Sequence, residues 1–491
     1  MISVSAPTDD LGISVLAECA GAAATHAGGG AEAAALVVRL LAQDARRRHT
    51  VDTADADLHL GVTLDGTELV LTLRDTGEPV NAPPATVLAL VELGLATAAD
   101  GGIDGAGNVL VARVPLPRHG RIVETEGLEV LPDDAAESDV PVEVRPLRAD
   151  DAFELTRCIF RCYGWTYAVQ DMYFPDRIAA AIGAGRRVGG VAVTPDGEVV
   201  AHVGFAFVAD GVVEGGVAVT DPRFRGRGLM GRVADEVDLS ALAVNAIMGR
   251  AVLTHPVTQK ASMGTGSALV GMFLDAAGPV QQVGFTDGLI DHRMSYAVTY
   301  RPILPLDPAE LWIPARYQPI ARHVLEASDL PLTIGEAHSA PVPPTSVMTS
   351  SYDALKQAGT VKVATVGDDL VAALDGILGQ FRTAGAEQVL VYLPADQPAL
   401  ATVGAGLPSL QLAYAAILPR FGELGTSLVL QWLRNPAVVI DHFVFADDRF
   451  RRLTELIVEQ ATELGDQETR QRLRRARLEQ LLALLPDDGT G

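Results

Sequence analysis

Cysteine is scarce in this chain. Cys19, Cys158 and Cys162 are the only three in 491 residues, too few for a disulfide framework in a protein of this size. No C-x-x-C motif is present, and Cys158 and Cys162 are four positions apart on an expected helix. We therefore expect buried thiols, and we expect no metal site.

The chain also lacks long apolar runs and an excess of basic residues. No segment reaches the roughly 18 apolar residues of a membrane span, and the start, MISVSAPTDD, has no basic stretch ahead of an apolar one. A cytoplasmic protein without membrane contact is expected. The formal net charge of −24 disfavours nucleic acid as a partner and is compatible with cationic amine substrates. Solvated acidic faces that keep the protein soluble are the favoured explanation of the same charge.

The chain has enough apolar residues, 48%, to fold into several domains. Helical and alternating patterns are interleaved throughout, which predicts a mixed α/β, multidomain protein. The expected parts are an α/β sandwich over 1–118, an acidic linker over 119–140, a mixed-sheet domain over 141–300, a second α/β domain over 301–460 and a C-terminal helix over 461–491. Asp65-Gly66 between two alternating runs is a hairpin signal.

A cationic, glycine-rich turn, DPRFRGRGLMGR at 221–232, stands out in this acidic chain. The surrounding order, β-α-β-β-β-loop-α-β, places it where a strand leads into a helix expected over 229–249. Glycines allow successive backbone N–H groups to point into one concavity, and a helix N-terminus favours anions. A pyrophosphate is the expected ligand, held by 226–231 with added charge from Arg225 and Arg227. The dinucleotide fingerprint G-x-G-x-x-G fits poorly, because a loop interposes before the glycines and the next strand ends without a carboxylate.

The arginine-led pattern R-x-x-G-x-[GA], with Arg225, Gly228 and Met230, resembles the coenzyme A loop of the GNAT (GCN5-related) N-acetyltransferases. Met230 departs from the usual small residue, although Gly231 follows it. The resemblance extends over 141–300 and implies acetyl-CoA, or another acyl-CoA, as cofactor. It implies that the strand before the loop pairs with the pantetheine amides, and that an N–H near Val219 stabilises the oxyanion. The implied coenzyme contacts are Val217, Val219, Arg225, Gly226, Arg227, Gly228, Leu229, Met230 and Gly231.

A general base should lie near the acceptor amine. Glu214, eleven residues before Arg225, occupies the position where GNAT enzymes often have a glutamate; an exposed edge-strand glutamate is the alternative. The usual late tyrosine that acts as general acid is not evident. Tyr163, Tyr167 and Tyr173 are expected to line the acceptor pocket, and His202 and His255 are expected to be structural histidines rather than proton shuttles.

The flanking parts resemble regions of bacterial proteins that fuse an ATPase-like domain to an acetyltransferase. LTLRDTGEPV resembles the D-x-G-x-P turn of the GHKL (histidine-kinase-like, anti-sigma kinase) ATPases, which implies that Asp75 accepts from adenine. Arg39 at the expected Mg²⁺-ligand position cannot bind a cation. We therefore expect a degenerate fold without ATP hydrolysis. The part after residue 300 resembles the GNAT-related C-terminal half of the fused proteins, lacks the coenzyme motif, and is expected to wall the acceptor pocket or to contact another subunit.

The sequence thus predicts an acyl-CoA-dependent N-acyltransferase acting on a small-molecule or peptide amine. The alternative from another class is a regulatory protein that binds acyl-CoA or a nucleotide without turnover. Two other enzymes are also considered. A tandem-GNAT aminoglycoside acetyltransferase would differ from this prediction only in its acceptor, and an active serine kinase is disfavoured by Arg39. The acceptor and the oligomeric state, including a homo-oligomer, are left open.

Overall fold

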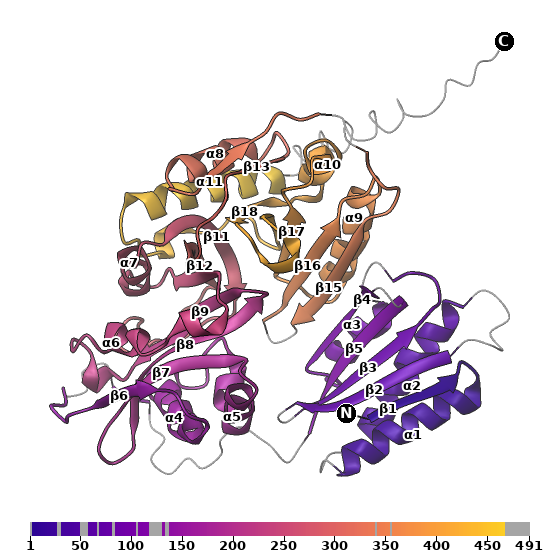
Figure 1. The fold of residues 1–491 in the computed structure, drawn as a ribbon, viewed down its shortest axis with the longest axis horizontal. Coiled ribbons are helices and arrows are strands. Elements are labelled where there is room, and N and C mark those ends of the chain that lie inside the picture. Colours follow the sequence, from indigo (N-terminus) through magenta and orange to yellow (C-terminus); the bar gives the residue numbers. More distant parts are fainter. Residues whose placement is uncertain are drawn as a thin grey trace.

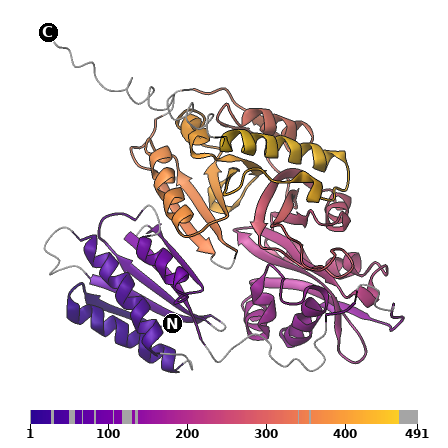
Figure 2. The ribbon, with the colours of Figure 1, turned by 180° about the vertical axis from the view of Figure 1, so that it is seen from behind.

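The computed structural model describes residues 2–26, 31–49, 57–65, 68–80, 84–104, 107–116, 130–132, 137–338, 341–353 and 356–466. The fold is mixed α/β, as the sequence predicts. Three parts lie side by side (Figures 1 and 2). Of the expected segment boundaries, the linker over 119–140 falls largely outside the described residues, and so does the helix over 461–491 beyond Asp466.

The N-terminal part is an antiparallel sheet with helices packed on it. Its strand order is β1-β2-β3-β5-β4, and Asp65 pairs with Glu68 across the expected hairpin, whose loop residues lie outside the described ranges. Alternate residues of β2 are buried, so one face of the sheet meets the helices. The elements are β1 (Ile2–Pro7), α1 (Asp10–His26), α2 (Ala31–Arg47), β2 (Asp57–Asp65), β3 (Glu68–Asp75), α3 (Ala85–Glu92), β4 (Ala98–Asp104) and β5 (Gly107–Pro115).

The middle part is a mixed sheet with helices on both faces. Its strand order is β6-β7-β8-β9-β10-β12-β11, and only the β9–β10 pair is parallel. Cys158 and Cys162 are buried in α4, as expected, whereas Cys19 of α1, also expected to be buried, is only partly buried. The elements are β6 (Glu143–Pro146), η2 (Ala149–Asp151), α4 (Ala152–Tyr163), η3 (Gln170–Tyr173), α5 (Pro175–Gly183), β7 (Arg187–Val193), β8 (Val199–Ala209), β9 (Val212–Thr220), η4 (Pro222–Phe224), α6 (Leu229–Asp235), η5 (Leu239–Leu242), β10 (Ala246–Val252), α7 (Val257–Gly264), β11 (Ala268–Ala277) and β12 (Met294–Pro302).

The helix expected over 229–249 is wrong in length. The α-helix ends at Asp235, and Ala246–Gly249 belong to strand β10. Asp238 is a residue type whose side chain competes with helical hydrogen bonding, and the apolar stretch after Asn245 pairs with two strands. Tertiary pairing therefore overrides the helical pattern.

The third part has the strand order β15-β16-β17-β19-β18, and the strands expected around 388–394, 413–418 and 427–433 are present. Its elements are β13 (Ala309–Leu311), α8 (Gln318–Glu326), β14 (Leu332–Ile334), β15 (Val347–Asp353), β16 (Ala358–Thr365), α9 (Leu370–Thr383), β17 (Gln388–Pro394), α10 (Ala399–Val403), η6 (Gly404–Leu410), β18 (Ala413–Leu418), η7 (Gly422–Leu424), β19 (Ser427–Leu433), η8 (Ile440–His442) and α11 (Asp448–Gly465).

The three sheets are joined edge to edge. β4 pairs with β15 over four residues, and β11 meets β18 where Gly271 faces Ala416. A Cβ at Gly271 would lie 1.9 Å from the carbonyl oxygen of Ala415, so only glycine permits this approach. Among the described residues, no helix has the length and apolarity needed to cross a membrane.

Candidate functional site

The parallel strands β9 and β10 diverge after a short pairing. They pair only from Val212 with Ala246 to Gly215 with Gly249. Beyond that point β10 continues along β12, and β9 continues along β8 to Thr220. In the described part of the chain, residues 216–220 therefore have no strand partner on their β10 side. No described strand covers this backbone edge, and only the Thr220 carbonyl at its end is engaged, by Arg225 Nε at 3.3 Å and Cys162 Sγ at 3.6 Å. An extended ligand can pair with an edge of this kind.

A β-bulge lies on this open edge. The β8–β9 register shifts between the pairs His202–Val219 and Gly204–Gly216, and Val217 has a φ of 51°. Positive φ is strongly disfavoured for a β-branched residue, and such strain is concentrated at functional positions. Bulges redirect backbone and side chains locally. Val217 and Val219, two of the expected coenzyme contacts, thus lie on a strained, one-sided strand.

The glycine-rich loop follows directly. Gly226 and Gly228 have φ values of 78° and 66°, and Gly228 is the N-cap of α6. Within the described structure, the N–H groups of 226–231 donate to no protein acceptor. A Cβ at Gly231 would point into open space, whereas Leu229 is buried and Met230 half-buried. The loop therefore presents several unpaired amides at an exposed helix start.

A buried ionic cluster anchors the start of this loop. Asp221 is buried and accepts from Arg161 Nε at 2.6 Å and from the Arg223 amide at 3.0 Å. Burial opposes ionisation, but hydrogen bonds and charges from Arg223 and Arg161 hold the pKa of Asp221 below its ordinary value. The carboxylate stays ionised, which fixes the end of β9 relative to α4.

The two loop arginines are already engaged by the protein. Arg225 donates to the carbonyl oxygens of Thr220, at 3.3 Å, and Val283, at 2.6 Å. Arg227 donates to the carbonyl oxygens of Ser138 and Val140. Both guanidiniums thus shape the loop, and their expected charge contribution to an anion site stays a prediction.

Residues 282–285 bridge the ends of the diverging strands. The Phe285 ring lies 4.2 Å from the His255 ring, which follows β10, and 4.6 Å from the Arg225 guanidinium, which follows β9. Thr254 also donates to Gln282. Phe285 is still 39% exposed, so its ring contacts the ends of both strands from the surface.

Glu214 lies where the strands begin to diverge and forms an ion pair with Arg250 of β10. Its side chain is 20% exposed and that of Arg250 is 37% exposed. Three tyrosines lie close enough for their pKa values to be raised by the Glu214 charge, in addition to burial: Tyr167, Tyr296 and Tyr392. The pKa is about 12 for Tyr296 and for Tyr392, so these phenols are neutral donors.

The expected pocket residues divide into two groups. The rings of Tyr163 and Tyr167 contact each other beside this site, with centroids 4.6 Å apart and planes tilted by 54°. Tyr173 is fully buried, and its hydroxyl contacts the backbone of Gly164 and Tyr167, so its role is structural. The sequence reasoning missed Arg250, Tyr296 and Tyr392. Tyr392 comes from β17 in the third part, and no local signal connects it to Glu214.

His202 has the buried, hydrogen-bonded position expected of a structural histidine, whereas the role of His255 stays a prediction. His202 is fully buried with Nδ1 2.7 Å from the Gly190 carbonyl oxygen, and burial lowers its pKa to about 4. Burial and the Arg225 charge lower the pKa of His255 to about 4. Neutral imidazoles of such low basicity are poor bases at neutral pH.

In the N-terminal part, the Asp75 carboxylate is buried and fully engaged. It accepts from Arg48 at 2.5 Å, from Asn108 at 2.9 Å and from the Gly77 amide at 2.9 Å. Arg48 also pairs with Asp44. The acceptor that the GHKL resemblance assigns to adenine is thus used within the protein.

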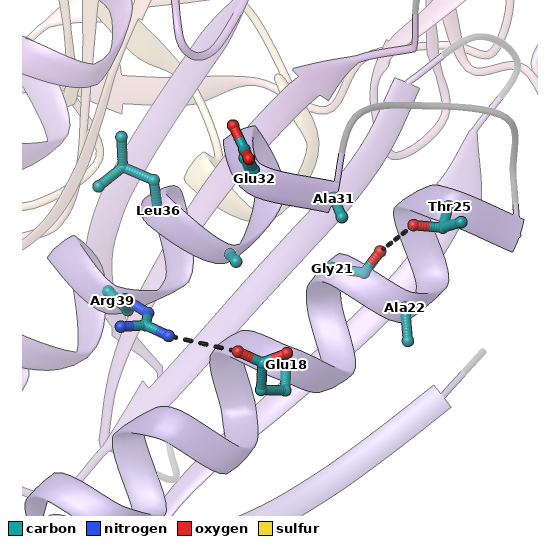
Figure 3. Close-up of a pocket in the computed structure, with 9 residues that line it drawn as sticks. Glu18, Gly21, Ala22, Thr25, Ala31, Glu32, Leu36 and Arg39 are labelled. Carbon is teal, nitrogen blue, oxygen red and sulfur yellow. Dashed lines mark hydrogen bonds and ion pairs between the residues drawn. The ribbon is translucent and has the colours of Figure 1, made fainter.

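Arg39 points away from this buried carboxylate. It pairs with Glu18 of α1 at 3.4 Å, in an open groove between α1 and α2 (Figure 3). The α2 residues that face the sheet are apolar: Ala34, Val37, Val38, Leu41, Ala42 and Ala45. The groove is lined by Glu18, Gly21, Ala22, Thr25, Ala31, Glu32, Ala35, Leu36 and Arg39.

One group of potential metal ligands is present among the described residues. Ligand atoms of Asp291, His292 and His442 lie within 4.8 Å of one another. Asp291 and His442 are exposed, and exposed groups of this kind are common without an ion.

Comparisons with known proteins give structural likeness only. No family model and no curated protein matches the sequence. Among solved structures, the chain is similar to a phosphinothricin acetyltransferase of Sinorhizobium meliloti in complex with AcCoA (17% identity, TM-score 0.27, covering 33% of this chain and 89% of that chain). It is also similar to ribosomal-protein-S5-alanine acetyltransferase of Vibrio fischeri (12% identity, TM-score 0.26, covering 34% of this chain and 97% of that chain). A third similar structure is the PaiA N-acetyltransferase of Thermoplasma acidophilum in complex with coenzyme A (12% identity, TM-score 0.25, covering 33% of this chain and 99% of that chain).

Proposed function

We propose that the middle part of the chain transfers an acetyl or other short acyl group from acyl-CoA to an amine. The observation that carries this proposal is the open edge of β9 at residues 216–220, which leads directly into the unpaired amides of 226–231. An extended, amide-containing arm can pair with such an edge, and a diphosphate can accept from such a loop. Pantetheine and pyrophosphate stand in this order in coenzyme A, and the motif resemblance to the GNAT family points to the same ligand.

The proposed chemistry is direct attack in a ternary complex. The neutral amine nitrogen attacks the thioester carbonyl carbon, the C–S bond breaks, and the proton lost by the amine ends on the coenzyme A thiol. Donors on the strained strand around Val217–Val219 stabilise the developing oxyanion, and holding both reactants together removes much of the entropic barrier. Glu214 is the nearest carboxylate on the same strand for accepting the amine proton. To do so it must exchange part of its ion pair with Arg250 for the substrate.

The non-catalytic alternative also has support. The Glu214 carboxylate is occupied by Arg250, residues 282–285 close the gap between the strands, and Asp75 of the N-terminal part is saturated. A protein that binds acyl-CoA as a signal would tolerate all three features.

The two functions are distinguished by measuring binding and turnover on the same preparation. Calorimetric titration with acetyl-CoA tests binding, and release of free thiol in the presence of an amine panel tests transfer. Binding with amine-dependent thiol release supports the acyltransferase; binding without release supports the sensor. No binding of acetyl-, propionyl- or butyryl-CoA would overturn both.

A further inference from the structure

Arg187 stands on the same sheet face as Glu214. Arg187 of β7 is paired with Ala206 of β8, which is paired in turn with Glu214 of β9. Directly paired residues project to the same face, and two strand spacings place the two backbones about 10 Å apart. The opposite face is covered by α6, because Val213 packs in the cluster that contains Leu229 and Val233. Arg187 and Glu214 therefore share the face to which Tyr167 contributes.

Arg187 has no anionic partner among the residues that the structure describes. No hydrogen bond or ion pair joins its guanidinium to any residue that the structure describes. The acidic groups nearest to it are committed elsewhere, since Asp171 pairs with Arg177 at 2.6 Å and Glu214 pairs with Arg250. The pKa of Arg187 is lowered by burial, in spite of the charges of Asp171 and Glu214. A partly desolvated guanidinium with five unused donors is costly unless a ligand supplies the acceptor.

Gly204 lies next to this guanidinium. A Cβ at Gly204 would be 3.3 Å from Arg187 Nη1 and 2.8 Å from His202 Nε2, so only glycine leaves both side chains in place. Tyr167 lies near both Arg187 and Glu214, and burial raises its pKa well above the ordinary value. The phenol therefore stays neutral beside the two charged groups. Arg187 and Glu214 thus carry opposite charges on the same face of the sheet, and Tyr167 lies near both.

We infer that Arg187 binds an oxyanion of the acceptor, so that the acceptor is an amine carrying a carboxylate or phosphate group. The inference rests on the function proposed above. With the oxyanion on Arg187, the amine reaches the side of Glu214, where the thioester carbonyl would lie. Arg187 is a specificity residue: it takes no part in bond formation, and the amine nitrogen acquires the acyl group while coenzyme A leaves as the thiol.

The test compares acceptors that differ only in the anion. Thiol release from acetyl-CoA is measured with γ-aminobutyrate against γ-aminobutyramide for the carboxylate arm, and with phosphoethanolamine against ethanolamine for the phosphate arm. We expect kcat/KM at least tenfold higher for the charged member of one pair. That tenfold difference corresponds to about 1.4 kcal/mol, the usual range for a charge-assisted contact. Equal values within both pairs would overturn the inference.

Substitutions at Arg187 and Arg186 test whether Arg187 causes the preference for an anionic acceptor. Arg187→Gln should raise KM for the preferred anionic acceptor about tenfold, leave its uncharged analogue unaffected and keep the acetyl-CoA dissociation constant unchanged. Arg187→Lys should restore part of the loss, because the charge returns without the planar donor pair. Arg186→Gln, at the exposed neighbouring arginine that pairs with Asp65, is the matched control and should resemble the parent protein. An equal KM increase in both variants would refute the assignment.

A binding readout separates this inference from the proposed function. Calorimetric titration with the charged acceptors in the presence of coenzyme A should show binding that Arg187→Gln weakens, even if no acyl group is transferred. Failure of acetyl-CoA to bind would remove the proposed function. Retained acetyl-CoA binding without any preference for the anion would remove only the role of Arg187.

Discussion

Single residues decide the shape of the glycine-rich loop at 226–231. Gly226 and Gly228 adopt left-handed conformations that other residues enter at a cost, which explains why glycine recurs there. Gly231 differs, because its backbone is ordinary and its missing side chain leaves open space at the third position of α6. No packing contact in the described structure requires glycine at position 231, which agrees with the diphosphate site proposed above.

Gly231→Leu tests that distinction. Leucine favours helix over glycine by about 0.5–1 kcal/mol, so the thermal midpoint should be unchanged or slightly higher. Acetyl-CoA affinity should fall at least tenfold, because the side chain would project into the space assigned to the diphosphate. Gly376→Leu, on α9 and also facing open space, is the control for a leucine in an exposed helix. Unchanged affinity in Gly231→Leu would place the diphosphate elsewhere.

His202 couples the stability of the middle part to pH. Its pKa is about 4 in the folded protein, through burial and the charge of Arg187, against 6.5 unfolded. The unfolded chain thus binds the extra proton between these values, and stability falls as the pH drops from about 6.5 to 4, by on the order of 3 kcal/mol. His202→Gln should flatten the pH dependence of the thermal midpoint over this range, whereas His59→Gln, at an exposed position on β2, should not. An identical slope in His202→Gln would contradict the linkage.

At the scale of elements, the parallel contact between β9 and β10 is the decisive feature. β9 and β10 pair over four residues, and then β9 continues along β8 while β10 continues along β12. This divergence leaves only the last part of β9 without a strand on one side. The same gap is bridged by Phe285 between His255 and Arg225. If coenzyme A binds between the two strands, as proposed, it would compete with the Phe285 ring for the same space.

Phe285→Ala should therefore raise the apparent affinity for acetyl-CoA. Removing one cation–π contact and one ring contact destabilises the bridged state by about 0.5–1.4 kcal/mol, so a two- to tenfold tighter dissociation constant and a faster association rate are expected. Stopped-flow binding measures both. Phe153→Ala, at an exposed phenylalanine on α4, controls for loss of a surface ring. Weaker binding in Phe285→Ala would show instead that the ring contacts the coenzyme.

At the scale of the whole molecule, edge pairing and ion pairs join the three parts. β4 pairs with β15, and Arg186 and Arg177 of the middle part reach Asp65 and Glu68 of the N-terminal part. These groups border a cavity of ≈ 350 Å³ between the parts. Tyr392 reaches the Glu214 region from the third part, so the proposed acceptor surface depends on the assembly of at least two parts.

Asp100 lies at the β4–β15 joint, and burial raises its pKa to about 6, although the Gly101 amide and Lys362 favour the charged form. The folded protein thus holds the proton more tightly than the unfolded chain, and its contribution falls as the pH rises from about 4 to 6. Asp100→Asn should raise stability at pH 7.5 by about 2 kcal/mol and remove this slope, seen by thermal unfolding. Asp57→Asn, on an exposed β2 position, is the control. Destabilisation at pH 7.5 would show that the charge at Asp100 is needed.

The sequence by itself determined the mixed α/β class, most strands, the buried cysteines and the position of the glycine-rich loop between β9 and α6. These features follow from local periodicity, from turn chemistry and from the conformational freedom of glycine. The end of α6 was not predictable from local pattern, because Ala246–Gly249 take their conformation from strands far away in the chain.

Only the tertiary structure decided the remaining features. Pairing between segments separated by tens to hundreds of residues makes β9 diverge from β10 and brings Arg250 and Tyr392 to Glu214. The same pairing leaves Arg187 without a partner among the described residues. Local periodicity carries no information about which distant edge a strand will meet or which charge will be left without a partner, because both depend on how the whole chain satisfies its backbone and its charges together.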